Sequence, residues 1–391
     1  MKLSTTLLAA ALTSLGGAAL AQNTIKIGNI VVTAGPLKGP GEPSVTAVDL
    51  AVEQINAAGG IAGKKIELFR FDTGSDPKQA SIGARKLMQD DKVLAVVGPF
   101  SSGETAVAVN DAERLKVLMM PTSASAPGLT DGRKYVWRLS EDEYKQFSRL
   151  LKSIKSKGIK SDTAEIVYIS DEVISNNAGT KLYPPLLASA NIKHGEPIAV
   201  QYKSFDMSAQ AARILAANPD LVAVAALPES ASKVIKELRR QGYKGRIIGS
   251  QLFADPNVLE LFGPEGNGTL LVAGFWKGHN VASQSFNDRL VAELKNRGIH
   301  KLGAHHVDAQ AFDTVFLLKQ VMESVGVTAD PAKLTQEREA LVAAMHGVRF
   351  SGVLGDNICF AGNDAELPGY IIEIKDGEWN KFDEAPADPC N

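Results

Sequence analysis

Apolar and polar positions along residues 25–120 follow two alternating patterns, one typical of buried strands and one typical of helices. Runs that are apolar almost throughout, as in strands covered on both faces, predict strands at 25–32, 65–71, 93–97 and 117–120. Apolar positions three or four residues apart predict helices at about 45–58, 77–89 and 105–115. Asp76 before Pro77 is typical of a helix start, and Gly59-Gly60 of a helix end.

The same alternation continues beyond residue 140. Further strands are predicted at 165–170, 199–202, 221–225, 246–249 and 270–276. Further helices are predicted at 141–157, 180–190, 208–217, 230–241, 285–297 and 308–325. The end of the chain reads as a β-hairpin of residues 370–374 and 378–382 around Asp376-Gly377. Strands that alternate with helices predict an α/β protein with two Rossmann-like lobes, each built on a parallel central sheet.

The turn from Gly98 to Thr105, between a predicted strand and a predicted helix, is the clearest candidate for a binding site. Such a turn of small residues offers free backbone N–H groups and hydroxyls to an anion. It nearly spells a phosphate-binding loop, but Glu104 stands where that loop requires lysine, and a carboxylate there would repel phosphate. We therefore predict a site for a small carboxylate. The alternative is a plain turn in which Ser102 caps the helix.

Composition and charge narrow the class of protein. The chain has 391 residues, of which 45% are hydrophobic and 22% charged, and this length suits two domains. The formal net charge of −2 argues against nucleic acid as a partner. Residues 1–21, with Lys2, an apolar run and Ala19-Leu20-Ala21, have the pattern of a secretory signal peptide. No later stretch is long and apolar enough to insert into a membrane, so we expect a soluble exported chain that begins at Gln22.

The residue types and motifs that usually form catalytic, metal or cofactor sites do not indicate an enzyme. Cys359 and Cys390 are the two cysteines, and export favours a disulfide between them over a metal pair or free thiols. No G-x-S-x-G motif occurs, and two S-x-x-K matches lack the companion K-T-G motif. His300, His305 and His306 lack an acidic residue at metal-ligand spacing and are predicted to be exposed. We expect no catalysis, no cofactor and no metal.

Several segments resemble periplasmic solute-binding proteins of the branched-chain amino acid (Leu/Ile/Val-binding) type, which serve ABC importers. The matching segments are Ala34-Gly35-Pro36, residues 49–63 (DLAVEQINAAGGIAG), residues 76–80 (DPKQA), residues 98–105, residues 121–130 (PTSASAPGLT) and Val136-Trp137-Arg138. The resemblance implies a type I periplasmic binding fold, in which three crossovers near 140, 272 and 352 hinge two lobes that close on a ligand. Lobe one would comprise 22–140 plus 273–351, and lobe two 141–272 plus 352–391.

The resemblance also implies which residues bind the ligand. In this family, a serine of the G-x-x-S-S turn and groups of an A-T-A-P loop hold the ligand's carboxylate at the carboxyl ends of the strands. By position these groups belong to Ser102, Ser123 and Ser125, with Ala124 supplying backbone atoms. Phe100 in the same turn is a further candidate contact, as is Leu227, which lies near a position where relatives carry a tyrosine.

One position departs from the family pattern. Relatives place a glutamate that binds the ligand's ammonium where this chain has Gln251. An amide cannot neutralise a buried cation. Asp171, at the end of a predicted strand, is an alternative source of negative charge, unless it only supports a turn. We therefore expect either an amino acid-like solute or an organic acid, aromatic acid or amide that lacks an ammonium.

The leading functional hypothesis is a periplasmic receptor that binds one small solute and delivers it to the membrane permease of an ABC transporter, acting as a monomer. The alternative is a sensor that signals to a receptor kinase or regulator. Both roles use the same cleft and the same closed surface, so the residues do not separate them.

Overall fold

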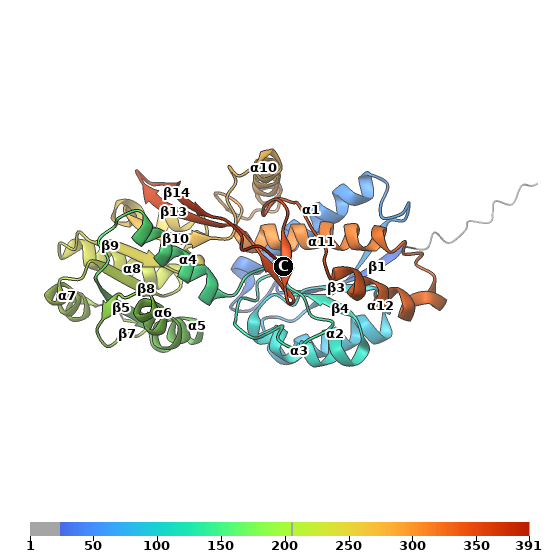
Figure 1. Ribbon diagram of the computed structural model, residues 1–391, viewed down its shortest axis with the longest axis horizontal. Helices are drawn as coiled ribbons and strands as arrows, with labels where there is room; N and C mark the ends of the chain where they lie inside the picture. The colour runs from blue at the N-terminus through green and yellow to red at the C-terminus, as the bar shows by residue number, and fades with distance from the viewer. Residues whose placement is uncertain (1–23, 205, 391) are drawn as a thin grey trace, which may run out of the picture.

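The computed structural model describes residues 24–204 and 206–390 (Figure 1), so the predicted signal peptide at 1–21 and the expected start at Gln22 lie outside the described residues. Two separate sheets organise the chain. The first contains four parallel strands in the order β2-β1-β3-β4. Its strands are β1 (Ile25–Val31), β2 (Ile66–Asp72), β3 (Ala95–Val97) and β4 (Leu118–Met120). We call this sheet and the helices packed on it lobe one.

Helices cover both faces of the first sheet. They are α1 (Lys38–Ala57), α2 (Pro77–Arg85), which continues into a π-helical turn at Lys86–Asp90, α3 (Ser102–Leu115), α10 (Val281–Asn296), α11 (His306–Ser324) and α12 (Leu334–Met345). Alternate strand residues face opposite sides: Ala95 and Val97 pack into the core with α1 and α11, whereas Val96 packs into the core with α2 and α3. This burial on both faces explains the continuous apolar runs in the sequence.

The second sheet has eight strands in the order β14-β13-β10-β9-β8-β5-β6, with β7 also paired to β5. These are β5 (Thr163–Ile169), β6 (Lys193–His194), β7 (Ile198–Val200), β8 (Leu221–Ala225), β9 (Arg246–Gly249), β10 (Thr269–Ala273), β13 (Gly369–Lys375) and β14 (Glu378–Ala385). The strands β5 to β10 are parallel, and the hairpin β13–β14 adds two antiparallel strands beside β10. The predicted hairpin around Asp376-Gly377 is therefore confirmed. We call this sheet and its helices lobe two.

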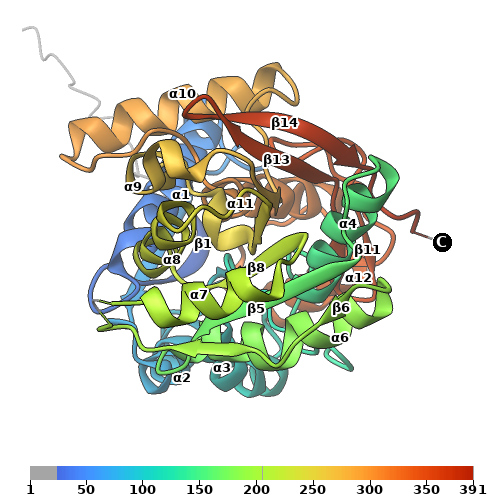
Figure 2. The ribbon, with the colours of Figure 1, turned by 90° about the vertical axis from the view of Figure 1, so that its left-hand side faces the viewer.

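The helices of lobe two are α4 (Glu143–Ser156), α5 (Val173–Asn177), α6 (Tyr183–Ser189), α7 (Ser208–Ala217), α8 (Pro228–Arg240) and α9 (Val258–Phe262). Shorter turns are the π-helical Ala178–Leu182 and the 3₁₀ turns Gln251–Ala254, Gly263–Gly266 and, in lobe one, Pro331–Lys333. Figure 2 shows β13 and β14 running beside α4, which packs against both strands. No described helix combines the length and apolarity that crossing a bilayer requires.

The chain passes between the two sheets three times: between β4 and α4, between β10 and α10, and between α12 and β13. The predicted α/β fold with two lobes and three crossovers is thus confirmed. On the third passage, a small hairpin of β11 (Cys359–Ala361) and β12 (Asp364–Glu366) packs on lobe one, where Phe360 lies edge-on against Trp137. The residue boundaries of the lobes stay predictions.

The predicted disulfide is present and joins Cys359 of β11 to Cys390 at the end of the described chain. The C-terminal tail after β14 therefore turns back toward the crossovers, and Figure 1 shows the C-terminus between the two lobes. Two ion pairs support this course, because the Asp388 carboxylate lies 3.2 Å from Lys145 Nζ and 3.5 Å from Arg149 Nη2, both in α4. We refer to residues 386–390 as the C-terminal clasp.

Candidate functional site

The turn after β3 is shaped by a helix cap that is distinct from the candidate serine. Ser101 caps α3, and Glu104 bonds back to the Ser101 N–H at 2.8 Å in a capping box. The Glu104 carboxylate is fully buried and also accepts a bond from the Thr73 hydroxyl. Glu104, which occupies the position of the lysine in a phosphate-binding loop, therefore stabilises the conformation of the turn. The alternative in which Ser102 caps the helix is wrong, because Ser101 does so.

Ser102 instead contacts the loop that follows β4. Its Oγ accepts hydrogen bonds from the backbone N–H groups of Ser125 and Ala126, each at 3.2 Å. A serine hydroxyl has two acceptor lone pairs and one hydrogen. With both lone pairs occupied, the hydroxyl can make a further bond only as a donor, which suits an anionic acceptor. Two of the predicted serines, Ser102 and Ser125, are thus brought together.

Arg138 holds this loop from behind. Its fully buried guanidinium donates from Nη1 to the carbonyl oxygens of Ala124 at 3.1 Å and Ala126 at 2.9 Å. The opposite edge forms a two-pronged ion pair with Asp364 of β12, with 2.7 Å between Nε and Oδ1. The Ala124 carbonyl, which also accepts from Ser140 Oγ at 3.1 Å, is therefore engaged inside the protein. The loop presents the half-buried side chains of Ser123 and Ser125.

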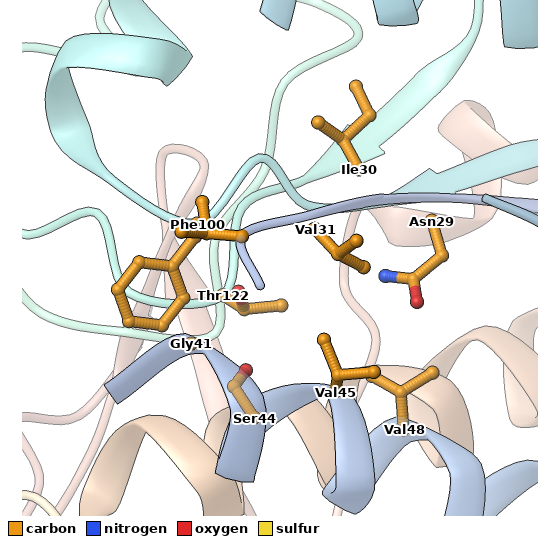
Figure 3. Close-up of a pocket in the computed structure, with 10 residues that line it drawn as sticks. Asn29, Ile30, Val31, Gly41, Ser44, Val45, Val48, Phe100 and Thr122 are labelled. Atoms are coloured by element: carbon orange, nitrogen blue, oxygen red, sulfur yellow. The ribbon is translucent and has the colours of Figure 1, made fainter. Parts of the chain in front are cut away.

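Phe100 lies beside this loop but is mostly buried, and it packs with Val32, Val307 and Leu37. Figure 3 shows Phe100 and Thr122 on one side of a small cavity and Ser44, Val45 and Val48 of α1 on the other. The cavity measures about 10 Å³, which is room for about one water molecule. It is therefore a packing space beneath the strand ends, too small for a solute.

The structure places the candidates of lobe two at three strand ends. Gln251 follows β9 and is buried, and its Oε1 has no hydrogen-bond partner among the described residues. Leu227 is half-buried and immediately precedes α8. Asp171 follows β5 and is exposed, and its Oδ1 accepts from the Tyr202 N–H at 2.7 Å. Asp171 thus has a local backbone partner, whereas Gln251 has unused hydrogen-bonding capacity.

A buried charge network near Gln251 joins the two lobes. Lys301 Nζ lies 2.8 Å from Asp308 of α11 and 3.5 Å from Asp255, which follows β9. Burial alone would lower the pKa of Lys301, but the charges of Asp308 and Asp255 raise it overall. His305 Nε2 lies 3.3 Å from the Gln251 carbonyl oxygen. These contacts fasten the turn after β9 to the start of α11.

The prediction of exposed histidines is right for His300 and wrong for its neighbours. His300 is exposed and lies 3.2 Å from Glu260, whereas His305 and His306 are buried where α11 begins. Burial lowers the pKa of both buried histidines, and that of His306 falls well below its usual range. Within the part of the chain that the structure describes, no three His, Cys, Asp or Glu side chains gather as a metal site.

Glu143, the first residue of α4, was not among the predicted site residues. Its backbone N–H donates to the Ser125 carbonyl oxygen at 3.1 Å, so it lies directly beside the serine loop. Burial, and secondly the charge of Asp142, raise the pKa of Glu143 to about 7. An acid in the first turn of a helix is an ordinary preference, so its type and position carry no sequence signal of binding.

Comparison with known proteins identifies relatives over nearly the whole described chain. A family model described as periplasmic binding protein matches residues 24–378. The Leu/Ile/Val-binding protein of Escherichia coli K12 is 26% identical over 323 residues, which cover 82% of this chain and 84% of that protein. The chemotactic signal transduction system substrate-binding protein BasB of Halobacterium salinarum is 31% identical over 56% of this chain and 55% of its own length.

A solved structure has the same fold. The solute-binding protein of an ABC transporter from Rhodopseudomonas palustris BisB5, in complex with 3,4-dihydroxybenzoic acid, aligns with a TM-score of 0.77 at 21% identity. The alignment covers 93% of this chain and 98% of the other. The family and the fold are therefore those that the sequence segments indicate. Because the relatives are binding proteins, the expectation that the chain is not an enzyme is also confirmed.

Proposed function

The chain belongs to the periplasmic binding protein family, and from this premise we propose that it is the extracytoplasmic receptor of an ABC importer. It binds a small carboxylate-bearing solute between the two lobes and presents it to a membrane permease. The predicted signal peptide and the predicted monomeric state belong to the same proposal. The lobes close about the three crossovers near 140, 272 and 352.

The orientation of the Ser102 hydroxyl carries this proposal. Because Ser102 Oγ already accepts two backbone N–H groups, its hydrogen is directed to a further acceptor. Ser125 adds a second hydroxyl for which the described residues provide no internal partner. Neutral donors close to a helix start can hold a carboxylate without a buried lysine or arginine. Ser123, Ala124, Phe100, Leu227, Asp171 and Gln251 are proposed to complete the walls of the site.

Replacing Ser102 or Ser125 by alanine is expected to weaken solute binding by about 1–3 kcal/mol each, because each change removes a hydrogen bond to a charged group. The solute is first identified by mass spectrometry after its release from denatured purified protein, and binding is then measured by calorimetry. Ser125→Ala should unfold at the wild-type urea concentration, since its hydroxyl has no partner within the described protein.

Ser156→Ala provides the matched control for this pair, because Ser156 is exposed at the far end of α4. Its affinity should equal that of the wild type. Wild-type affinity in both Ser102→Ala and Ser125→Ala would place the carboxylate site elsewhere.

A sensory role is the second candidate, and the likeness to BasB favours it, because BasB is named for chemotactic signal transduction. Solute binding and lobe closure are common to both roles. Deleting the gene separates them: loss of uptake of the identified solute supports transport, whereas intact uptake with loss of a response to that solute supports sensing.

A further inference from the structure

The disulfide joins parts of the chain that belong to different lobes. Cys359 lies in the hairpin of β11 and β12, and backbone hydrogen bonds fix this hairpin on lobe one by joining Arg138 to Asn363 at 3.0 Å and to Ala365 at 3.1 Å. Cys390 ends the C-terminal clasp, which leaves lobe two where β14 ends. The bond is therefore a fourth covalent connection between the lobes, in addition to the three crossovers.

This fourth connection runs beside the third crossover. On lobe two, Gly369 at the start of β13 pairs with Ala385, the last residue of β14. On lobe one, Glu366 at the end of β12 pairs with Cys359, the first residue of β11. The segment from Glu366 to Gly369 and the segment from Ala385 to Cys390 thus cross between the lobes at the same place and in opposite directions.

Two cations of α4 contact both segments. Lys145 pairs with Glu366 of the crossover and, at 3.2 Å, with Asp388 of the clasp. Arg149 donates to the Leu367 carbonyl oxygen at 2.6 Å and lies 3.5 Å from the Asp388 carboxylate. Because the Asp388 side chain is 61% exposed, these pairs guide the clasp but hold it only weakly. The disulfide is the firm attachment at its far end.

Two joined segments restrict motion more than one does. A single strand between two bodies leaves rotation about its φ and ψ bonds available, whereas two strands that are fixed to each other at both ends have to twist together. The pairing of Gly369 with Ala385 fixes one end, and the disulfide fixes the other. Residues 386–390 reach at most about 18 Å when fully extended, so the clasp has limited slack.

We propose that the disulfide-closed clasp is a brace that limits how far the two lobes rotate relative to each other in the solute-free protein. This inference rests on the proposed function in one respect, because it assumes that the lobes open and close. A narrower range of open orientations reduces the conformational freedom that is lost when the lobes close on a solute. The brace thus prepares the open protein for closure.

A pair of insertions separates the brace from the size of the disulfide loop. Gly-Ser-Gly-Ser inserted between Asp388 and Pro389 lengthens the clasp by up to about 14 Å and keeps both cysteines. The same four residues inserted between Asp376 and Gly377 are the matched control, because they enlarge the same loop at the β13–β14 turn, at the opposite end of the hairpin from the crossover. A non-reducing peptide map verifies that both proteins contain the disulfide.

The distance between the lobes is measured by double electron–electron resonance. Spin labels are attached to ketone amino acids at Lys78 and Glu229, two exposed positions at the starts of α2 and α8, which follow strands of the two different sheets. Each protein is unfolded, dialysed to remove solute and refolded with its disulfide intact. The clasp insertion should broaden the distance distribution toward longer distances, whereas the turn insertion should leave the wild-type distribution unchanged. The double variant Cys359→Ser, Cys390→Ser should broaden it in the same way.

The outcomes distinguish the brace from the proposed function. Equal broadening by both insertions overturns the brace, because loop size and not the span between the lobes would then matter. A broad distribution that is the same in the wild type and in every variant also overturns it, but leaves lobe movement standing. A narrow distribution in all of them overturns the brace, and if it stays unchanged when the solute identified by mass spectrometry is added, the proposed lobe closure fails as well. The serine site does not enter this measurement.

Discussion

Replacing Arg138 by methionine is expected to lower the free energy of unfolding by about 3–5 kcal/mol, the loss typical of a buried ion pair that is deprived of one partner. The change leaves the Asp364 carboxylate with Thr130 Oγ1, at 2.6 Å, as its remaining side-chain donor. It also removes the donor that Arg138 supplies to the Ala124 and Ala126 carbonyls. Methionine keeps most of the apolar stem, so the loss reports on the guanidinium. Urea unfolding monitored by circular dichroism measures it.

Arg114→Met is the matched control. The Arg114 side chain is 55% exposed and pairs with Asp111 of α3, a carboxylate that keeps Arg85 and Ser81 as partners when Arg114 is changed. Such a pair contributes at most about 1 kcal/mol. In the absence of urea, Arg138→Met should in addition weaken solute binding, because the guanidinium holds the loop that carries Ser123 and Ser125. Equal unfolding midpoints for the two arginine variants would contradict the structural role assigned to Arg138.

Loss of the disulfide is expected to lower the free energy of unfolding by about 3–4 kcal/mol in the double variant Cys359→Ser, Cys390→Ser. The bond spans a sequence separation of 31 residues, and closing a loop of this size restricts the unfolded chain by about that amount. The C-terminal clasp should also loosen, which hydrogen exchange at residues 386–390 would detect.

Reduction provides the internal control for this prediction. A reducing agent should bring the wild type to the unfolding midpoint of the double variant and leave the variant itself unchanged. If the wild type keeps its midpoint under conditions that a peptide map shows to be fully reducing, the bond does not stabilise the folded chain.

Much of the fold follows from local signals in the sequence. Apolar runs marked the parallel strands because both faces of each sheet are covered, and Asp76 caps α2 ahead of Pro77 as the pattern predicts. The start of α1 was displaced, since the helix begins at Lys38 and includes Pro43. There the helix packs so closely on the residue that follows β1 that a Cβ on Gly41 would lie 2.1 Å from the Val32 carbonyl oxygen. A contact of this kind joins separate segments of the chain, so no periodic pattern of apolar residues reveals it.

The candidate site likewise contains residues that the sequence indicated and residues whose surroundings it could not indicate. Ser102 and Ser125 were found through the resemblance, and the structure joins them through backbone N–H groups. The burial of His305 and His306 and the position of Glu143 beside the serine loop depend on residues from other segments of the chain. Asp255 and Asp308, whose charges act on His305, lie 50 positions before it and three positions after it, and Tyr183 lies 40 positions from Glu143. Only the folded chain shows which charges are already paired.

The close approach of Gly98 to β1 is another feature that the sequence alone does not explain. Gly98 has a φ of 105°, and a Cβ there would lie 2.3 Å from the Ile30 carbonyl oxygen. Glycine alone fits this position, and the turn that carries Ser102 begins from it. The sequence showed a glycine in a turn, whereas the reason for it lies in a neighbouring strand.

The C-terminal clasp has a practical consequence for anyone who engineers this protein. A fluorescent reporter or affinity tag fused after Cys390 would be tethered next to the crossovers, where the two lobes meet, and not at a remote free end. Such a fusion is well placed to report the proposed lobe closure optically, but a bulky one is also positioned to obstruct it. Production in a reducing cytoplasm would leave the disulfide unformed. The same fusion would then give a different signal there than in an oxidising compartment.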